Sequence, residues 1–448
     1  MKFAVQTSVL SKRWKNIWMS LPYISSDWKS FREGGVIDAA ERFLTFVDKV
    51  FEFRNDSVIQ KIKLVFVILN DISVQALNRW ILAAVDHNVQ RLDINGAHAD
   101  NLAYEIPYEL LNCKSLKSLT ILLLGVSTDI ILPNSMSLPQ IKKMWLGGIS
   151  ISNLELQRLF SSCPLMEDAT IQKCLIHSDS QRNIIIDSQR LGIFKVLDNH
   201  HKHLGLDDHF LTYSDKIFTP NLRHFICSGF MTEGFSLQNP SSLVTAQFRM
   251  RLREKEDDET AETYSELPAE EKEVFAKRMM KFLGAVHNVR QMTLSSGFLE
   301  VLLQAPGSLY LQPPQLSKLV ILELEMRFTR SCLRSIAYLL NISPLLIILE
   351  LKSKESNLAD IKDDWEAEFS LACMFTHLKV VEIREVEGCD NEVQFLRFLL
   401  KKSTVLEKVN LFFQSTGGSH DNGRQVRRFK RNLRVLPTAS SNIKMNFM

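Results

Sequence analysis

A pattern of six residues, apolar-x-x-apolar-x-apolar, recurs along most of this chain of 448 residues. Successive copies begin 21 to 32 residues apart, except for one gap of 46 residues. A single copy is weak evidence because apolar residues are common, but a register kept through most of a chain predicts a stack of similar structural units. The thirteen copies begin at Ile59, Val89, Leu116, Ile141, Met166, Leu191, Leu222, Leu243, Val289, Leu319, Leu346, Leu378 and Leu406.

The spacing of the copies is typical of leucine-rich repeats, which contain about 20–29 residues each. Side chains alternate along a strand, so the fourth and sixth residues of each copy are expected to point into the core. Apolar residues at helical spacing, such as Leu156, Leu159 and Phe160, lie between copies. We predict an α/β leucine-rich-repeat solenoid with parallel strands on its concave face and helices outside. A doubly wound α/β domain is the alternative, but it rarely keeps one period through so many units.

The composition gives no indication of a membrane or of a strongly charged partner. The 54 basic and 51 acidic residues leave a formal net charge of +3. No apolar stretch approaches the roughly 20 residues that a membrane-spanning helix needs. The seven cysteines are scattered and include no Cys-x-x-Cys pair, which favours buried thiols in a cytoplasmic and/or nuclear protein.

The chain carries no recognisable catalytic motif. It has no Gly-rich phosphate loop, no dinucleotide fingerprint, no Gly-x-Ser-x-Gly and no His-Glu-x-x-His. The densest histidine cluster is His200, His201, His203 and His209, in a polar stretch without a nearby cysteine. An exposed loop explains this cluster better than a metal site. We therefore predict no enzyme activity, no cofactor and no metal site.

The gap of 46 residues holds a densely charged stretch that begins at Arg251. Val274, Met279 and Phe282 follow at helical spacing. We interpret residues 251–281 as a charged insertion, in which a polar loop precedes a longer outer helix. A docking site for a regulator is the alternative, but charged loops are usually solvated.

Leu10, Trp14, Ile17 and Leu21 would share one face of a helix near the N-terminus. Such a helix could simply cap the repeat array. Residues 7–22 also resemble the second half of a plant F-box, a helical segment that helps to dock the Skp-family adaptor of a cullin-based ubiquitin ligase. The first half of that motif has no counterpart before Met1, so about half of the adaptor-binding surface is expected. The resemblance implies adaptor contacts by Leu10, Arg13, Trp14, Ile17, Trp18 and Leu21.

The C-terminal part carries a second resemblance. Residues 377–384, Gly388, the apolar run 395–400 and the closing residues 436–441 are similar to the FBD module that ends many plant F-box/leucine-rich-repeat proteins. Both ends therefore resemble one architecture, the plant F-box/FBD/leucine-rich-repeat protein. This architecture divides the chain into a partial F-box-like segment, a repeat solenoid and an FBD-like module that continues the solenoid, at residues 1–31, 32–370 and 371–448.

Six basic residues lie between Arg424 and Arg434. Such a run can act as a nuclear-localisation signal or bind nucleic acid. Phe429 is the one aromatic residue within it, so base stacking has little support. A basic surface helix or loop of the FBD-like module is the better interpretation, and nucleic acid is not an expected partner.

If the fourth and sixth residues of each copy point inward, the third, fifth and seventh line the open face. This face changes from basic to acid-rich along the chain, and Trp145 is a candidate anchor for a partner, unless its ring packs on a neighbouring side chain. We expect a target protein to bind here. The expected contact residues are Lys63, Arg91, Lys143, Trp145, Glu323, Glu325, Glu350 and Glu382.

The two resemblances imply the substrate-recognition subunit of an SCF-type ubiquitin ligase, which holds an unknown target protein on the solenoid and the adaptor at its N-terminal segment. The alternative is a leucine-rich-repeat scaffold for protein interactions with no link to the ligase, because the F-box match is partial. Binding of the adaptor would distinguish the two.

Overall fold

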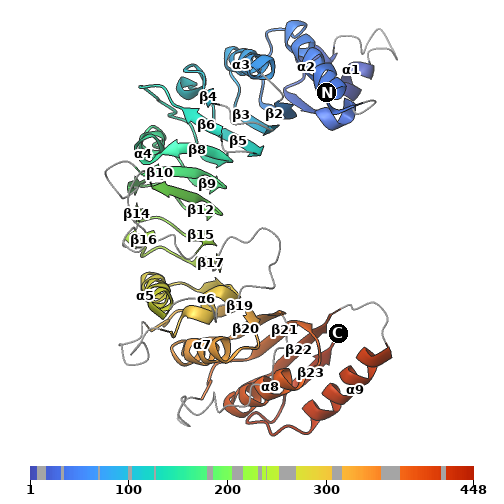
Figure 1. Ribbon diagram of the computed structural model, residues 1–448, viewed down its shortest axis with the longest axis vertical. Helices are drawn as coiled ribbons and strands as arrows, with labels where there is room; N and C mark the ends of the chain where they lie inside the picture. Colours follow the sequence, from blue (N-terminus) through green and yellow to red (C-terminus); the bar gives the residue numbers. More distant parts are fainter. Residues whose placement is uncertain are drawn as a thin grey trace. The chain divides into compact units, whose positions relative to one another are not determined.

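The copies of the six-residue pattern become strands in a computed structural model of the chain (Figure 1). The chain divides into unit 1, which is Met1–Leu222 with Leu237–Asn239, and unit 2, which is Arg223–Ser236 with Pro240–Met448. This division is not one of the boundaries predicted from the sequence. The structure describes residues 1–7, 17–31, 35–68, 71–98, 103–125, 128–178, 185–203, 215–230, 235–238, 240–251, 269–304, 315–354, 374–414 and 420–448.

The strands that carry the repeats of unit 1 are parallel to one another. The third residues of successive copies are partners across the sheet, as in the series Lys61, Arg91, Ser118 and Lys143. The predicted repeat register is therefore the register of the sheet. In spatial order the strands are β1 (Tyr23–Asp27), β2 (Lys61–Ile68), β3 (Arg91–His98), β5 (Ser118–Gly125), β7 (Lys143–Gly147), β9 (Asp168–Gln172) and β12 (Ile193–Leu197).

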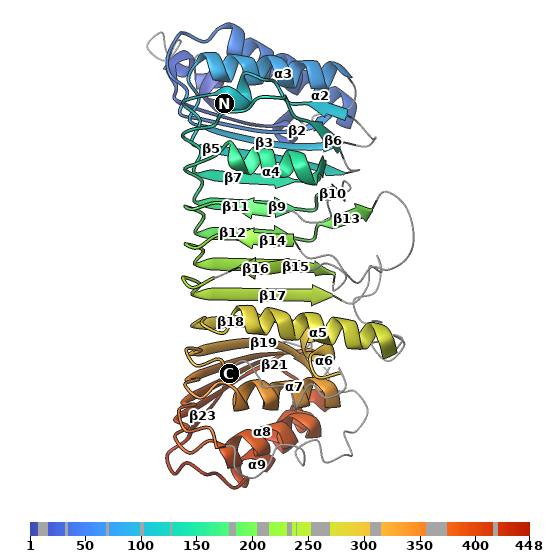
Figure 2. The same cartoon turned by 90° about the vertical axis from the view of Figure 1, so that its left-hand side faces the viewer.

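Helices and a second row of short strands connect the repeats of unit 1 and lie on one side of the long strands (Figure 2). The helices are α1 (Lys2–Gln6), α2 (Val36–Glu52), α3 (Asp71–Asp86) and α4 (Asn153–Ser161), with short 3-10 helices at Ile17–Ser20, Trp28–Phe31 and Leu110–Asn112. The short strands are β4 (Ala103–Glu105), β6 (Thr128–Ile131), β8 (Ile149–Ser152), β10 (Leu175–Ser178), β11 (Ile185–Asp187), β13 (His200–His203) and β14 (Asp215–Phe218). A further strand, β16 (Phe235–Gln238), follows in the chain.

Unit 2 continues the same pattern, with helices between most of its strands. The strands are β15 (His224–Phe230), β17 (Thr245–Arg251), β18 (Gln291–Leu294), β19 (Ile321–Arg327), β20 (Ile348–Lys354), β21 (Val380–Val386), β22 (Lys408–Phe413) and β23 (Lys444–Phe447), all parallel and in this spatial order. The helices are α5 (Ala269–Ala285), α6 (Ser296–Val301), α7 (Arg330–Asn341), α8 (Asp390–Lys402) and α9 (His420–Arg434). Figure 1 shows α7 and α8 on one side of β19–β22.

The core confirms the inward-pointing positions of the repeat. In all thirteen copies the side chains at positions four and six are at most 3% exposed, from Ile62 and Leu64 in the first copy to Val409 and Leu411 in the last. Burial of this ladder removes apolar surface from water and stabilises the stack by about 25 cal/mol for each Å² buried. The α/β leucine-rich-repeat fold predicted from the spacing is therefore the observed fold.

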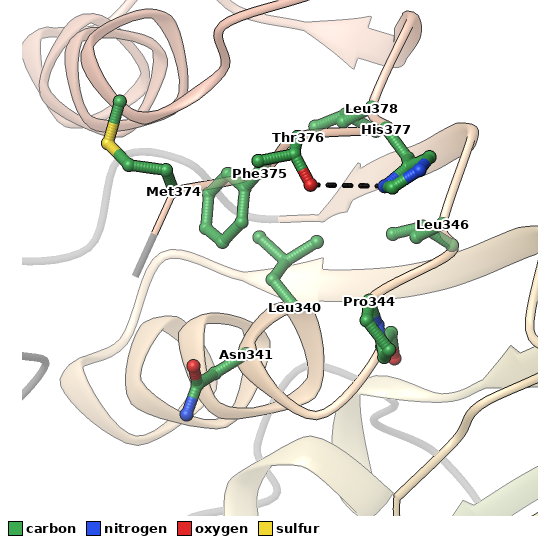
Figure 3. A pocket seen from close by; sticks show the side chains of 10 residues that line it. Leu340, Asn341, Pro344, Leu346, Met374, Phe375, Thr376, His377 and Leu378 are labelled. Atoms are coloured by element: carbon green, nitrogen blue, oxygen red, sulfur yellow. Dashed lines mark hydrogen bonds between the residues drawn. The ribbon is translucent and has the colours of Figure 1, made fainter. Parts of the chain in front are cut away.

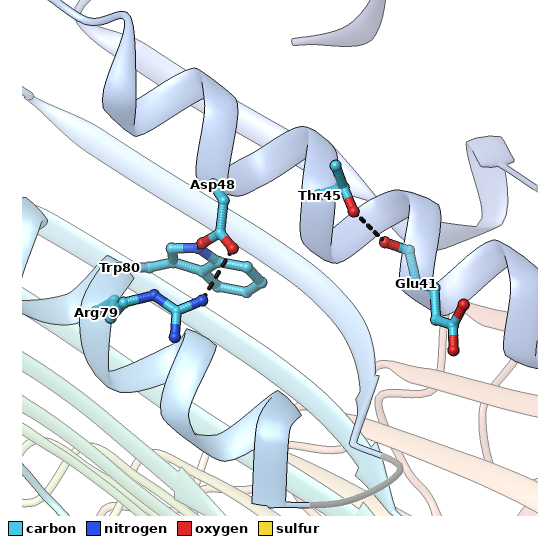
Figure 4. A network of polar contacts seen from close by, with 5 residues as sticks. All are labelled: Glu41, Thr45, Asp48, Arg79 and Trp80. Atoms are coloured by element: carbon cyan, nitrogen blue, oxygen red, sulfur yellow. Dashed lines mark hydrogen bonds and ion pairs between the residues drawn. The ribbon is translucent and has the colours of Figure 1, made fainter.

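Helices α2 and α3 cover the first repeats through a cluster of aromatic side chains. The Trp80 ring meets Phe43 and Phe66 edge-on, with centroids 6.0 and 5.9 Å apart. The carboxylate of Asp48 on α2 accepts hydrogen bonds from the Trp80 indole at 2.7 Å and from the Arg79 guanidinium at 2.9 Å. One turn earlier, the Thr45 hydroxyl donates to the Glu41 carbonyl at 3.0 Å (Figure 4). The two helices are thus joined by apolar packing and by a shared carboxylate.

The outer helix predicted within the charged insertion is α5, which buries Met279 and Phe282. The polar loop predicted before it falls on residues 252–268, which lie outside the described residues. None of the helices in the described ranges combines the length and the apolar composition needed to cross a bilayer.

Candidate functional site

The N-terminal segment places the predicted adaptor-binding residues in different environments. Leu10, Arg13 and Trp14 lie outside the described residues. Ile17 begins a 3-10 helix and is 50% exposed, whereas Trp18 is 8% exposed and packs in the interior of unit 1. Leu21 is half-buried, and its carbonyl accepts a hydrogen bond of 2.7 Å from Arg54. Of the described residues in this set, Ile17 is therefore the one that offers an exposed apolar side chain to a partner.

The outward-pointing strand residues of unit 1 form what we call strand face 1, defined by Lys63, Arg91, Lys143 and Trp145. All four side chains are exposed, between strand positions that are buried. Lys143 on this face and the nearby Lys61 each pair with an acid of the next strand, because Lys61 lies 3.1 Å from Asp93 and Lys143 lies 3.9 Å from Asp168. Exposed pairs of this kind contribute little to stability, so these side chains remain available to exchange partners.

Trp145 is the large aromatic side chain of strand face 1 and is 40% exposed. Its indole N–H donates to the Gln172 side chain at 3.2 Å, and its register partners are Thr120 and Thr170. A tryptophan flanked by threonines leaves much of its ring open to solvent, and this is the property of an anchor residue at an interface. The sequence left open whether this ring packs on a neighbouring side chain or is accessible to a partner. In the structure it is hydrogen-bonded to a neighbour and is also accessible to solvent.

The outward-pointing residues of unit 2 form strand face 2, defined by Glu323, Glu325, Glu350 and Glu382. Glu323, Glu350 and Glu382 are direct register partners on β19, β20 and β21, so about 5 Å separates one from the next across the sheet. Side chains with amide or hydroxyl groups donate hydrogen bonds to the two outer glutamates of this row. Gln291 and Thr293 donate to Glu323 at 2.6 and 3.1 Å, and Asn410 donates to Glu382 at 2.9 Å.

Glu350 lies at the centre of the row. Partial burial and then the neighbouring carboxylates of Glu323 and Glu382 raise its pKa, while Arg384 opposes the shift. Glu325 belongs to a second row, in which Lys352 is its register partner and Arg384 is the register partner of Lys352. A cationic group that approaches strand face 2 would relieve the repulsion in the first row, because it would pair with carboxylates that now repel one another.

We expect Glu350→Gln to raise the stability of unit 2 at pH 7, by less than about 1 kcal/mol because the site is well solvated. The folded protein raises this pKa above the usual 4.5, so the stability that Glu350 contributes when protonated is present below pH 4.5 and is lost as the pH rises through the folded pKa. The gain of the variant should therefore vanish below pH 4.5. Urea unfolding at both pH values measures it, and a gain that persists in acid would contradict this explanation.

The FBD-like part of unit 2 has a buried carboxylate at the start of α8. Glu392 is 1% exposed and accepts hydrogen bonds from the backbone N–H groups of Glu387, Gly388 and Cys389, at 3.1, 2.6 and 3.0 Å. Gly388 has a φ of 83°, which favours glycine, and a Cβ there would lie 3.5 Å from Phe429. This carboxylate holds the turn that connects β21 to α8.

A small cavity of about 210 Å³ lies beside the C-terminal end of α7 (Figure 3). Its walls include apolar side chains such as Leu340 and Phe375, and Thr376 and His377 are hydrogen-bonded to each other at 3.0 Å. Cavities that hold drug-sized ligands usually have about 300–1,000 Å³. The size of this cavity and its single titratable side chain give no reason to assign it a cofactor or a reaction.

The described residues include no group of three or more histidine, cysteine or acidic side chains that could hold a metal ion. His200, His201 and His203 belong to β13, but their side chains, like residue 209, lie outside the described ones. The six cysteines that the structure describes are buried and form no disulfide with one another.

Comparison with known proteins identifies relatives that align over most of the chain. Residues 77–211 match the model of the leucine-rich repeats of FBD-associated F-box protein At5g56370, and residues 369–411 match the FBD model. F-box/LRR-repeat protein 13 of Arabidopsis thaliana is 26% identical over 420 residues, 92% of this chain and 85% of that protein. F-box/FBD/LRR-repeat protein At5g22660 of the same plant is 25% identical over 424 residues, 91% and 84% of the two chains. FBD-associated F-box protein At1g66310, also from Arabidopsis thaliana, is 33% identical over 264 residues, 57% and 54% of the two chains.

Proposed function

The chain belongs to the plant F-box/FBD/leucine-rich-repeat family, and we propose that it is the substrate-recognition subunit of an SCF-type ubiquitin ligase. In this role it binds a target protein on its strand faces and an adaptor of the Skp family through its N-terminal segment. It acts by binding alone, in the cytoplasm or the nucleus, while the ligase supplies the chemistry. The names of the relatives describe F-box and repeat proteins, and none of the names given above is that of a catalyst.

The observation that carries the proposal is the alternation of the repeat strands. Positions four and six are buried throughout, so the intervening positions expose a two-dimensional array of side chains at the fixed spacing of a sheet. Rigid arrays lose little conformational entropy on binding. In unit 1 such an array holds exposed basic residues and Trp145, and in unit 2 it holds the row of three glutamates.

The charges of the strand faces favour a target of complementary chemistry. The carboxylates of Glu323, Glu350 and Glu382 suit a segment rich in lysine or arginine, because such a segment would offset the repulsion between carboxylates that, after burial, raises the pKa of Glu350. Strand face 1 suits a more acidic or neutral segment that covers the Trp145 ring. The charge of each face would exclude target segments of the wrong polarity.

We expect Trp145→Ala to weaken target capture by about tenfold, corresponding to the loss of one aromatic anchor. Because the ring is exposed on one side, the stability of unit 1 should fall by no more than about 1 kcal/mol. Affinity capture from plant extract with the variant and the unchanged chain, followed by quantitative mass spectrometry, gives the loss. Unchanged capture by a folded variant would remove Trp145 from the proposed interface.

The link to the ligase is tested by co-purification of the chain with a Skp-family adaptor. We expect the adaptor to bind, and Ile17→Asp to reduce its binding because a charge replaces an exposed apolar contact. Ile131→Asp is a matched control, since Ile131 is 49% exposed and Ile17 is 50% exposed. If the unchanged chain and an N-terminally extended chain both fail to bind the adaptor, the ligase role is excluded.

The second candidate function is a protein-interaction scaffold without a ligase link. The burial of Trp18 favours this alternative, because one of the two tryptophans that could anchor an adaptor packs inside unit 1. Under this alternative the strand faces still capture the target, but the adaptor is absent from the purified complex. The co-purification experiment therefore separates the two functions without knowledge of the target.

A further inference from the structure

Helix α9 carries five arginines on one face. Successive helical residues are separated by about 100°, so these residues fall within an arc of about 120° and extend over about 15 Å of the helix axis. Every one of these side chains is exposed. They are Arg424, Arg427, Arg428, Arg431 and Arg434, which we call the arginine face.

The opposite side of α9 fixes the helix on unit 2. Phe429 and Leu433 are each 1% exposed, and the Phe429 ring meets Phe413 edge-on at 6.0 Å. The Lys430 ammonium lies 5.0 Å from the Phe413 centroid and 5.1 Å from that of Phe447. The sixth basic residue of the run is thus used for packing, and the five arginines are held on a helix of fixed orientation.

One carboxylate already lies against the arginine face. Asp390, at the start of α8, pairs with Arg428 at 3.3 Å, and both side chains are mostly exposed. Within the described residues, Arg424, Arg431 and Arg434 form no ion pair with this chain's own acids. Five guanidinium groups along about 15 Å of one helix face make a concentrated positive patch on a chain whose formal net charge is only +3.

We infer that the arginine face of α9 is a second binding surface, which takes an acidic polypeptide segment rich in aspartate and glutamate. Guanidinium groups bind carboxylates in bidentate geometry, and the Asp390–Arg428 pair shows a carboxylate accommodated at this surface. An extended segment places about four to five residues along 15 Å, a number of charges comparable to the five arginines. This inference does not depend on the proposed ligase role, because α9 takes no part in strand face 1 or strand face 2.

A protein segment fits this surface better than nucleic acid. Duplex DNA carries about one charge per 1.7 Å of its axis, so 15 Å would present about nine phosphates to five arginines. Single strands bind through aromatic platforms, but Phe429 is buried and the Phe413 and Phe447 rings are covered by Lys430. The described surroundings of the arginine face therefore provide charge without a stacking surface.

The experiment uses the full chain and a fluorescein-labelled peptide of alternating aspartate and glutamate, with binding followed by fluorescence anisotropy at low salt. The test variant combines Arg424→Gln, Arg427→Gln, Arg431→Gln and Arg434→Gln, and leaves Arg428 with Asp390. A second variant places lysine at the same four positions. The matched control removes equal charge from exposed sites elsewhere, with Lys49→Gln, Lys114→Gln, Lys117→Gln and Lys318→Gln.

The glutamine variant is expected to bind the peptide at least about tenfold more weakly, and the control to stay within about threefold of the unchanged chain. The lysine variant should lose less affinity than the glutamine variant, because it keeps the charge but not the bidentate geometry. Added salt should weaken the binding of the unchanged chain. Undiminished binding by the glutamine variant would overturn the inference, and so would equal losses in the glutamine variant and the control. A single-stranded RNA of equal charge that binds more tightly than the peptide would also overturn it, in favour of a nucleic-acid surface.

Discussion

Replacing Trp80 with alanine is expected to destabilise unit 1 by about 4 kcal/mol, the largest loss among the substitutions considered. The side chain is 2% exposed, and its ring contacts Phe43 and Phe66, which belong to α2 and β2. Its removal would leave a cavity between helix and sheet and would leave Asp48 without its indole donor. In a stack where each repeat packs on its neighbours, such a defect uncouples the first repeats from the rest.

Trp80→Phe separates the two causes. Phenylalanine keeps most of the ring volume and loses the N–H group that donates to Asp48, so the expected loss is about 1–2 kcal/mol. Urea unfolding followed by far-UV circular dichroism, which does not depend on tryptophan fluorescence, measures the free energy of unfolding of both variants. Hydrogen exchange of α2 and α3 shows where the structure loosens. If the phenylalanine variant is as unstable as the alanine variant, the hydrogen bond and not the packing dominates at this position.

Replacing Glu392 with alanine is expected to destabilise the C-terminal part of unit 2 by about 3 kcal/mol. Three backbone N–H groups in the turn before α8 donate to this carboxylate, and the side chain is 1% exposed. Without an acceptor these groups would be buried and unsatisfied, and the start of α8 would lose its cap. The turn also includes Gly388, which contacts α9, so the defect should reach both helices.

Hydrogen exchange of peptides from α8 and α9 locates this effect, and global unfolding gives its size. Asp390→Ala is the matched control, because Asp390 lies in the same first turn but is exposed and has only a surface pair with Arg428. Its expected loss is below about 1 kcal/mol. Equal losses at Asp390 and Glu392 would show that general charge near the helix start matters, and not the specific hydrogen bonds of Glu392.

The repeat register could be predicted from the sequence because each copy buries two alternating residues on a short strand. Strands β1 and β23 could not be predicted in this way, since Tyr23–Asp27 and Lys444–Phe447 do not carry the six-residue pattern. The second row of short strands also went unpredicted. Segments such as Ile149–Ser152 are too short to show a period, and their pairing is set by the stacking of neighbouring repeats.

For the candidate site, the sequence predicted which strand residues point outward but not their hydrogen bonds. Alternation alone placed Lys63, Trp145 and Glu350 on the exposed side of their strands. The outer glutamates of the row accept hydrogen bonds from Gln291, Thr293 and Asn410. No sequence pattern predicted these three donors. Their roles depend on side-chain conformation across adjacent strands. The interior position of Trp18 likewise depends on packing between distant segments, and helical spacing near the N-terminus carries no information on it.

The most direct test of target binding at the strand faces reverses the charge of strand face 2. The double variant Glu323→Lys, Glu350→Lys is compared with Glu270→Lys, Glu273→Lys on helix α5, which changes the same charge away from the strands. Proteins captured from plant extract by the unchanged chain are quantified for both variants. We predict that the strand-face variant remains folded and loses these proteins by about tenfold or more, while the helix variant retains them. Equal capture by the unchanged chain and the strand-face variant would contradict the account and would place the target on another surface.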